Sequence, residues 1–156
     1  MALQIGDSAP LFTLKDSDKN DVSLENFKGE NVLLLFYPLA FTGTCTTELC
    51  DMRDNLTTYQ SLNTKVLAIS IDTVFAQAKF KEEQGLNFPL LSDFNKEVSA
   101  DYDVLYEEFV LGMKGVAKRS AFVIDKEGVI QYTEILENAG ELPDFEKIKE
   151  KLAGLN

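Results

Sequence analysis

Three uninterrupted apolar runs constrain the fold of this chain more than any other feature of its sequence. They lie at about Val32 to Tyr37, in KVLAISID from Lys65 to Asp72, and in SAFVID from Ser120 to Asp125. Each run is short and is bounded by polar or turn-forming residues. Because such runs are typical of strands buried on both faces of a sheet, we predict a central sheet flanked by helices.

Segments with helical patterning separate these strands. The predicted helices are Cys45 to Leu62, a segment capped by Asp72 or Thr73 that runs to about Gln84 before Gly85, Asn95 to Tyr102, and a last helix that begins at Pro143 and ends near Leu152. Alternating strands and helices indicate the α/β class.

Shorter strands complete the predicted sheet. NFPLLSD favours a short strand with a turn, and VIQYTEIL follows the turn DKEG as an antiparallel strand, so the sheet is mixed. FTLKD and DVSLENF suggest an N-terminal hairpin extension. No repeat, linker or low-complexity run interrupts the chain, which predicts a single domain over residues 1–156.

Composition and charge exclude several functions. Acidic residues outnumber basic ones by 26 to 15, and no Lys/Arg cluster occurs, so we expect no nucleic-acid partner. The acidity itself is accounted for by solubility. The chain has no histidine and only two cysteines, which excludes histidine-dependent triads, metal sites that need histidine and four-cysteine zinc sites.

The start of the chain predicts a cytoplasmic protein. MALQIGDSAP is neither basic nor continuously apolar, unlike a signal peptide. The longest apolar runs fall far short of the ~20 residues that span a bilayer, so no membrane association is expected. Because the cytosol keeps thiols reduced, a permanent structural disulfide is not expected either.

Cys45 and Cys50 lie five positions apart in the predicted helix that follows the first buried strand. In the first turn, Cys45 meets free backbone N–H groups and the positive end of the helix dipole, which favour its thiolate form. Five residues of ideal helix place two Cα atoms about 8 to 9 Å apart, whereas a disulfide requires about 7 Å or less. A Cys45–Cys50 bond therefore requires local unwinding. Oxidation of Cys45 to a sulfenic acid followed by attack of Cys50 fits this spacing. The alternative is that Cys50 is only a small apolar residue of the helix.

The stretch PLAFTGTC, from Pro38 to Cys45, resembles the Pro-x-x-x-Thr-x-x-Cys motif of peroxiredoxins. The resemblance covers nearly the whole chain, through GDSAPLFTL, FYPLAFTGTCTTE, FPLLSD and KRSAFVID. It implies a thioredoxin-like fold and reduction of hydroperoxides, without a flavin, haem or metal cofactor.

The resemblance also implies a role for each motif residue. Cys45 is the peroxidatic cysteine, whose thiolate attacks a peroxide oxygen. Thr42 offers its hydroxyl to the thiolate and the peroxide, and Pro38 shields the thiolate from water. The backbone N–H groups of Thr44 and Cys45 donate to the peroxide.

Two charged residues are expected beside the thiol. Arg119 holds the thiolate and polarises the leaving oxygen, because fixed donors aimed at developing negative charge lower the barrier and a guanidinium stays protonated. Glu48 is interpreted as the partner that orients Arg119, or alternatively as an acid in the first helical turn that stabilises the dipole. Arg53 is a further candidate contact, or a solvated helix charge.

The second cysteine leaves two mechanisms open. Cys50 resembles the resolving cysteine of the Q group, or bacterioferritin comigratory proteins, which predicts an intrachain disulfide reduced by a thioredoxin-like or glutaredoxin-like protein. PLAFTG is similar to E-type alkyl hydroperoxide reductases, which lack that cysteine and need an external thiol.

Apolar residues near the motif are candidates for the peroxide pocket. Leu39 and Phe41 are predicted at its rim, or at the interface of a homodimer, and the sequence is compatible with a monomer as well. The aromatic residues Phe36, Phe80 and Tyr106 are further candidates, although aromatic residues at such positions are more often part of a core.

Three other classes of protein compete with this interpretation. A thioredoxin-like disulfide oxidoreductase predicts a Cys-x-x-Cys motif and a proline before the facing strand, and both are missing. A redox sensor or holdase would use the same pair of thiols without rapid turnover. A purely structural protein requires Thr42, Cys45 and Arg119 to coincide by accident.

Overall fold

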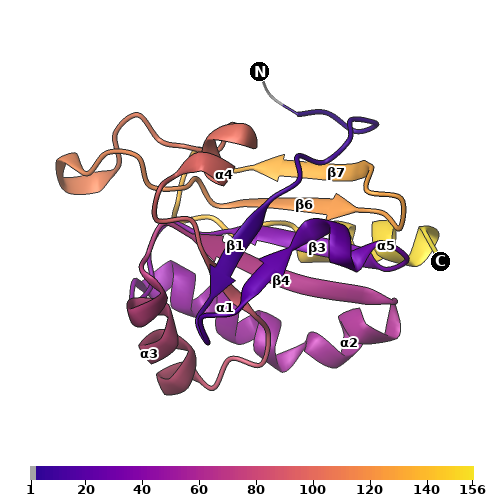
Figure 1. Ribbon diagram of the computed structural model, residues 1–156, viewed down its shortest axis with the longest axis horizontal. Helices are drawn as coiled ribbons and strands as arrows, with labels where there is room; N and C mark the ends of the chain where they lie inside the picture. The colour runs from indigo at the N-terminus through magenta and orange to yellow at the C-terminus, as the bar shows by residue number, and fades with distance from the viewer. Residues whose placement is uncertain (1–2) are drawn as a thin grey trace.

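The computed structural model describes residues 3–156 and arranges them around a seven-stranded sheet (Figure 1). The strands are β1 (Thr13–Asp16), β2 (Asp21–Ser23), β3 (Asn31–Phe36), β4 (Thr64–Ser70), β5 (Leu90–Ser92), β6 (Ser120–Ile124) and β7 (Ile130–Ile135). Their order across the sheet is β2-β1-β5-β4-β3-β6-β7. The β3–β4 and β4–β5 pairs are parallel and the other neighbours are antiparallel. The prediction of a mixed α/β sheet with an N-terminal hairpin is confirmed.

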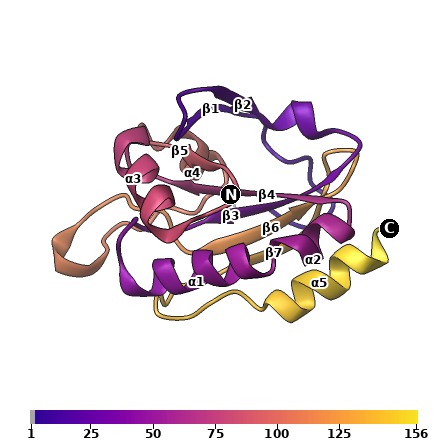
Figure 2. The same ribbon diagram turned by 90° about the horizontal axis from the view of Figure 1, so that it is seen from below.

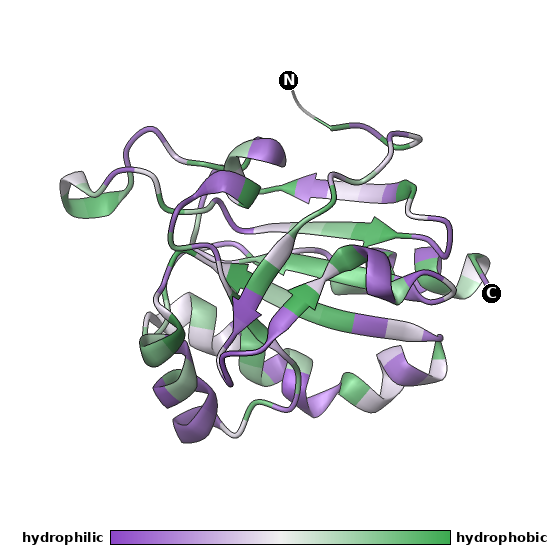
Figure 3. Ribbon diagram, in the orientation of Figure 1, coloured by the Kyte–Doolittle hydropathy of each residue, from purple (hydrophilic) through white to green (hydrophobic). Residues whose placement is uncertain are grey.

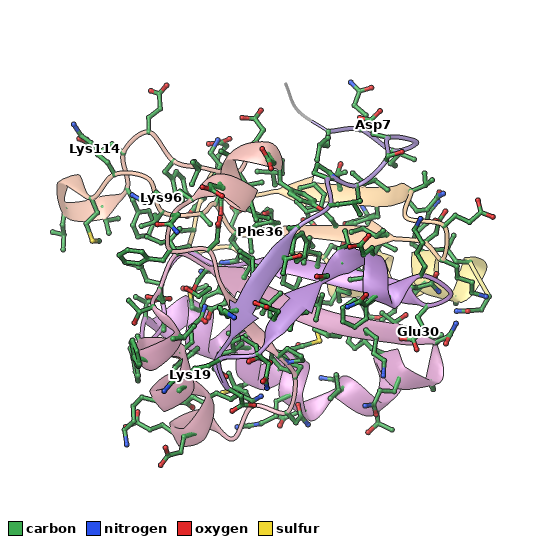
Figure 4. The ribbon with its side chains drawn as sticks, in the orientation of Figure 1. Asp7, Lys19, Glu30, Phe36, Lys96 and Lys114 are labelled. Atoms are coloured by element: carbon green, nitrogen blue, oxygen red, sulfur yellow. The ribbon has the colours of Figure 1, made fainter. Side chains whose placement is uncertain are left out.

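The three apolar runs form the centre of the sheet, as predicted. All six residues of β3 are buried, as are all five of β6. Successive side chains point to opposite faces: Leu33 and Leu35 join one core cluster, and Leu34 and Phe36 join the other. Figure 3 shows these strands as the apolar centre of the molecule, and Figure 4 places Phe36 in the interior while Lys114 and Glu30 lie at the periphery.

Helices cover both faces of the sheet. They are α1 (Gly43–Asp54), α2 (Leu56–Ser61), α3 (Val74–Gln84), α4 (Glu97–Asp101) and α5 (Phe145–Gly154), with 3-10 turns η1 (Leu24–Phe27) and η2 (Val110–Gly112). Residues of α1, α2, α3 and α5 pack in the cluster that contains Leu33, and residues of α4 and η1 pack in the other. Figure 2 shows α1, α2 and α5 running close to one another. Within residues 3–156, no helix combines the length and the apolar character that crossing a membrane requires.

The predicted single helix from Cys45 to Leu62 is wrong in two respects. The helix begins earlier, at Gly43, and it is interrupted at Asn55 between α1 and α2. The Asn55 side chain donates to the backbone carbonyl of Asp51 at 2.8 Å and to its carboxylate at 3.3 Å. Such side-chain bonds compete with the helical ladder, which explains the break.

The ends of the other helices agree with the sequence more closely. Thr73 caps α3 by accepting the N–H of Ala76, and Gly85 ends it with a left-handed φ of 62°. The last helix begins at Phe145, two residues after Pro143, because Asp144 is its cap and accepts the N–H of Lys147. Helix α4 is shorter than the predicted segment.

A segment between α4 and β6 projects from the body of the molecule (Figure 1). Tyr106 and Val116 pair through their backbones at 2.9 Å, and Gly115 donates to the carbonyl of Tyr106 at 3.1 Å. The turn η2 forms its tip, where Leu111 is 95% exposed. This projection was not predicted, and one wall of the candidate active site comes from it.

Candidate active site

The loop that joins β3 to α1 carries the motif residues. Residues at the end of β4 and just after it hold this loop in place. The carboxylate of Asp72 accepts the backbone N–H of Ala40 at 2.8 Å and the hydroxyl of Ser70 at 2.6 Å. Pro38 is buried. Phe41, three residues after Pro38, has a left-handed φ of 67°. These bonds hold the loop at the start of α1.

Cys45 is the third residue of α1, so it lies in the first helical turn, as predicted. Its side chain is fully buried. Arg119, which immediately precedes β6, donates from Nη2 to the sulfur of Cys45 at 3.3 Å. The structure therefore brings together two residues that lie 74 positions apart in the chain. The sulfur of Cys45 thus lies beside a positive charge and close to the N-terminus of a helix.

The Arg119 guanidinium is fixed on several sides. Nη1 donates to Glu48 Oε1 at 2.7 Å, and Nε and Nη2 donate to the Ala139 carbonyl at 3.3 and 3.0 Å. Burial by itself lowers the pKa of Arg119, but Glu48 and Cys45 raise it above its ordinary value. The group thus stays charged, and its planar donors are oriented before any substrate arrives.

Glu48 is a buried acid, and among residues 3–156 its one cationic partner is Arg119, which also contacts the thiol of Cys45. Its side chain is fully buried, and its second oxygen, Oε2, has no hydrogen-bond partner among the described residues. Burial raises the pKa of Glu48 to about 7, against the opposing effect of Arg119. Because α1 begins at Gly43, Glu48 lies in the second turn rather than the first. This position fits the predicted contact with Arg119 and not the alternative role at the helix dipole.

The hydroxyl of Thr42 is engaged differently from the sequence-based expectation. Thr42 is the N-cap of α1, and its hydroxyl donates to the Leu39 carbonyl at 2.7 Å. Its proton is therefore already used, while the lone pairs of its oxygen stay available as acceptors. The Thr42 carbonyl accepts both the N–H and the hydroxyl of Thr46, at 2.9 and 2.8 Å.

A pocket of about 450 Å³ opens beside Arg119. It is lined by Thr42, Gly43, Thr44, Tyr106, Glu108, Phe109, Val110, Arg119, Glu137, Asn138, Ala139 and Gly140. The start of α1 forms one side, the projecting segment a second, and the loop after β7 a third. Cys45 directly follows the lining residue Thr44 in the chain, and its buried sulfur is 3.3 Å from Nη2 of the lining residue Arg119.

The apolar candidates take different places. Tyr106 lines the pocket, whereas Leu39 and Phe41 are not among its lining residues. The Phe41 ring is 51% exposed and packs edge-on against Phe80, 5.2 Å between centroids. Phe36 and Phe80 are fully buried in the two core clusters, so the suggestion that they form the pocket is wrong.

Cys50 and Arg53 lie on a later turn of α1, against the end of α3. The half-buried thiol of Cys50 donates to Gln84 Oε1 at 3.4 Å. Arg53 donates to the backbone carbonyl of Gln84 and to the carboxylate of Asp54. The suggestion that Arg53 contacts the peroxidatic site is therefore wrong, because its guanidinium is used near Cys50.

Several groups that build the site are not predictable from the sequence. The Ala139 carbonyl that holds Arg119 is a backbone group in an irregular loop. The hydroxyl of Tyr106 donates to the Glu137 carbonyl at 3.1 Å and so ties that loop to the projecting segment. Asp72 was predicted only as a helix cap. Among residues 3–156, no group of three or more acidic or thiol side chains is arranged to hold a metal ion.

A free thiol at the start of a helix, beside a buried arginine and next to a pocket, is an arrangement suited to thiol chemistry. Comparisons with known proteins specify the family. A model described as the AhpC/TSA family matches residues 5–133. The alkyl hydroperoxide reductase E of Mycobacterium tuberculosis is 38% identical over 156 residues, which cover 98% of each chain.

Solved structures show the same likeness. The peroxidoxin BcpB of Mycobacterium tuberculosis has a TM-score of 0.87 at 30% identity, with 99% of both chains covered. A mutant of PrxQ from Xylella fastidiosa has a TM-score of 0.88 at 26% identity, covering 99% of this chain and 98% of that one. The chain belongs to the AhpC/TSA family. Its resemblance to peroxiredoxins and its thioredoxin-like fold are both confirmed, and membership implies thiol-dependent peroxide reduction.

Proposed function

We propose that this protein is a thiol peroxidase that reduces hydrogen peroxide and organic hydroperoxides through Cys45. The observation that carries the proposal is the 3.3 Å contact between Arg119 Nη2 and the sulfur of Cys45, at the start of a helix and beside a pocket. Family membership gives the class of chemistry, and this contact supplies the physical reason for it. The reacting sulfur is held next to fixed donors that suit the leaving oxygen.

In the first step, the Cys45 thiolate attacks one oxygen of the hydroperoxide. The S–O bond forms, the O–O bond breaks, and the electron pair of the O–O bond leaves with the second oxygen. The cysteine becomes a sulfenic acid, and the leaving oxygen takes a proton to form water or an alcohol. Arg119 and the N–H groups of Thr44 and Cys45 stabilise the negative charge, and Thr42 accepts a hydrogen bond from the peroxide. Pro38 excludes water from the sulfur.

In the second step, Cys50 attacks the sulfenic acid, releases water and forms an intrachain disulfide. Both thiols lie on α1, so part of the helix must unwind first. A thioredoxin-like or glutaredoxin-like dithiol then reduces the disulfide by exchange. The cytoplasm, where such reductants keep thiols reduced, is the compartment that we propose. In the alternative route, an external thiol attacks the sulfenic acid and Cys50 takes no part.

Single-turnover kinetics test the proposal. Reduced protein is mixed with excess hydrogen peroxide or an alkyl hydroperoxide, and peroxide loss is followed in a stopped-flow instrument. The wild type and Cys50→Ser should consume the first equivalent at the same rate, whereas Cys45→Ser should consume none. Equal activity of wild type and Cys45→Ser would exclude Cys45 as the reacting group. A fast first turnover without recycling by any dithiol would instead favour a redox sensor.

A further inference from the structure

Three contacts connect the part of α1 that carries Cys50 and Arg53 to the end of α3 and the loop after it, and we call this set the α1–α3 clasp. Cys50 Sγ donates to Gln84 Oε1 at 3.4 Å, and the Arg53 guanidinium donates to the Gln84 backbone carbonyl. In the opposite direction, Asn87 Nδ2 donates to the carbonyl of Arg53 at 3.3 Å. The clasp thus holds both the thiol and the helical turn that carries it.

The beginning of α1 is less well suited to a stable helix than the clasped turn. The hydroxyls of Thr46 and Thr47 bond back to the carbonyls of Thr42 and Gly43, at 2.8 and 3.1 Å. Such bonds slightly destabilise and bend helices, and threonine and glycine are weak helix formers. Local helix propensity is therefore low near Gly43, and the clasp is a tertiary attachment of the Cys50 side chain that must break for its thiol to move.

We propose that the α1–α3 clasp sets how quickly Cys50 is released to react with the sulfenic acid on Cys45. This inference rests on the proposed function, and it adds positioning residues, Gln84 and Asn87, outside the peroxide site. In the clasped state, the Cys50 thiol is bonded to Gln84, and the intact helix α1 keeps it apart from Cys45. In the released state, the Cys50 sulfur is free to attack.

Two reactions then compete for the same sulfenic acid. In one, the Cys50 thiol displaces the hydroxyl of Cys45–SOH, so that a disulfide and water form. In the other, a second hydroperoxide transfers an oxygen to Cys45–SOH, which becomes a sulfinic acid while the peroxide is reduced to water or alcohol. A long-lived clasp favours the second reaction and a short-lived clasp the first. The clasp therefore controls the sensitivity of the protein to inactivation by excess peroxide.

Variants that weaken the clasp test this inference. Gln84→Met keeps the length of the side chain and its preference for helix but removes the acceptor of the Cys50 thiol. Asn87→Ala removes the bond to Arg53 and leaves the Cys50 contact in place. Glu83→Gln is the matched control, because Glu83 lies next to Gln84 on α3 but is not part of the clasp, and its exposed carboxylate pairs with the exposed Lys79 at 3.8 Å.

The assay separates the two steps. Reduced protein is mixed with one equivalent of hydrogen peroxide, quenched with acid at millisecond intervals, and analysed by intact mass. Each clasp variant should form the disulfide about 2- to 10-fold faster than wild type, the range expected for loss of one hydrogen bond, with unchanged oxidation of Cys45. Both variants should also accumulate less sulfinic acid at high peroxide. Glu83→Gln should match wild type in every step.

Other outcomes contradict specific parts of the account. An unchanged or slower disulfide step in both clasp variants, in a protein whose wild type forms the Cys45–Cys50 bond, overturns the clasp alone. A wild type that stops at the sulfenic acid overturns Cys50 as the resolving group and the clasp together. A wild type that does not oxidise at Cys45 overturns the proposed peroxidase itself.

Discussion

Replacing Glu48 with glutamine should make the free energy of unfolding less dependent on pH. Glu48 is fully buried, and Arg119 is the cation that it contacts, at 2.7 Å. The same guanidinium also holds the sulfur of Cys45. Glutamine keeps the shape of the side chain and an oxygen that accepts from Arg119 Nη1, but its amide does not ionise between pH 5 and pH 8. The variant thus removes the titration and leaves the packing nearly intact.

The size of the effect follows from the pKa of Glu48, which burial raises from 4.5 to about 7. A carboxyl with a raised pKa favours the folded state fully below pH 4.5 and loses that contribution as the pH rises through about 7. Integrated between pH 5 and pH 8, the loss is about 2 kcal/mol. Wild type should therefore lose about this much stability relative to Glu48→Gln over that interval.

Urea unfolding at pH 5 and pH 8 measures this difference. Both proteins should carry Cys45→Ser, so that titration and oxidation of the thiol do not contribute. The Cys45→Ser protein should become less stable at pH 8, and the double variant should show a smaller change by about 2 kcal/mol. Identical pH dependences, or a larger loss in the double variant, would refute the raised pKa of Glu48.

Two further predictions concern the first chemical step. Arg119→Lys should slow the oxidation of Cys45 by hydrogen peroxide about 10²-fold or more, because one ammonium cannot replace the donors that reach the sulfur, Glu48 and Ala139. Stopped-flow measurement of peroxide loss gives this rate, and a change below threefold would argue against the role of Arg119. Thr42→Val should slow the oxidation of Cys45 about 10-fold through loss of one hydrogen bond, whereas Thr42→Ser should keep the wild-type rate. Equal rates for the valine and serine variants would show that the hydroxyl is not needed.

The sequence predicts the centre of this fold well because the relevant signals are local. Most residues of β3, β4 and β6 form short apolar runs, which are typical of strands buried on both faces of a sheet. The place of Cys45 in a first helical turn follows from the loop before it. The contact with Arg119 links residues 74 positions apart, and it was predicted from family resemblance rather than from physical pattern.

Other features depend on bonds that a sequence pattern does not reveal. The break between α1 and α2 results from the Asn55 side chain bonding to Asp51, in a segment whose apolar spacing suits a continuous helix. The projecting segment is held by backbone pairing of Tyr106 with Val116 and Gly115. The sequence predicts that Arg53 lies on α1, but it does not reveal that the guanidinium bonds to Gln84 on α3. The predicted contact of Arg53 with the peroxidatic site is wrong for this reason.

The most direct test of the account is the mass of the reduced protein after one equivalent of hydrogen peroxide, followed by peptide mapping. We predict the loss of two hydrogens and a disulfide that links the peptides containing Cys45 and Cys50. A Cys45 that stays reduced for seconds in folded protein would contradict the central claim that this thiol, held against Arg119, reacts with peroxide.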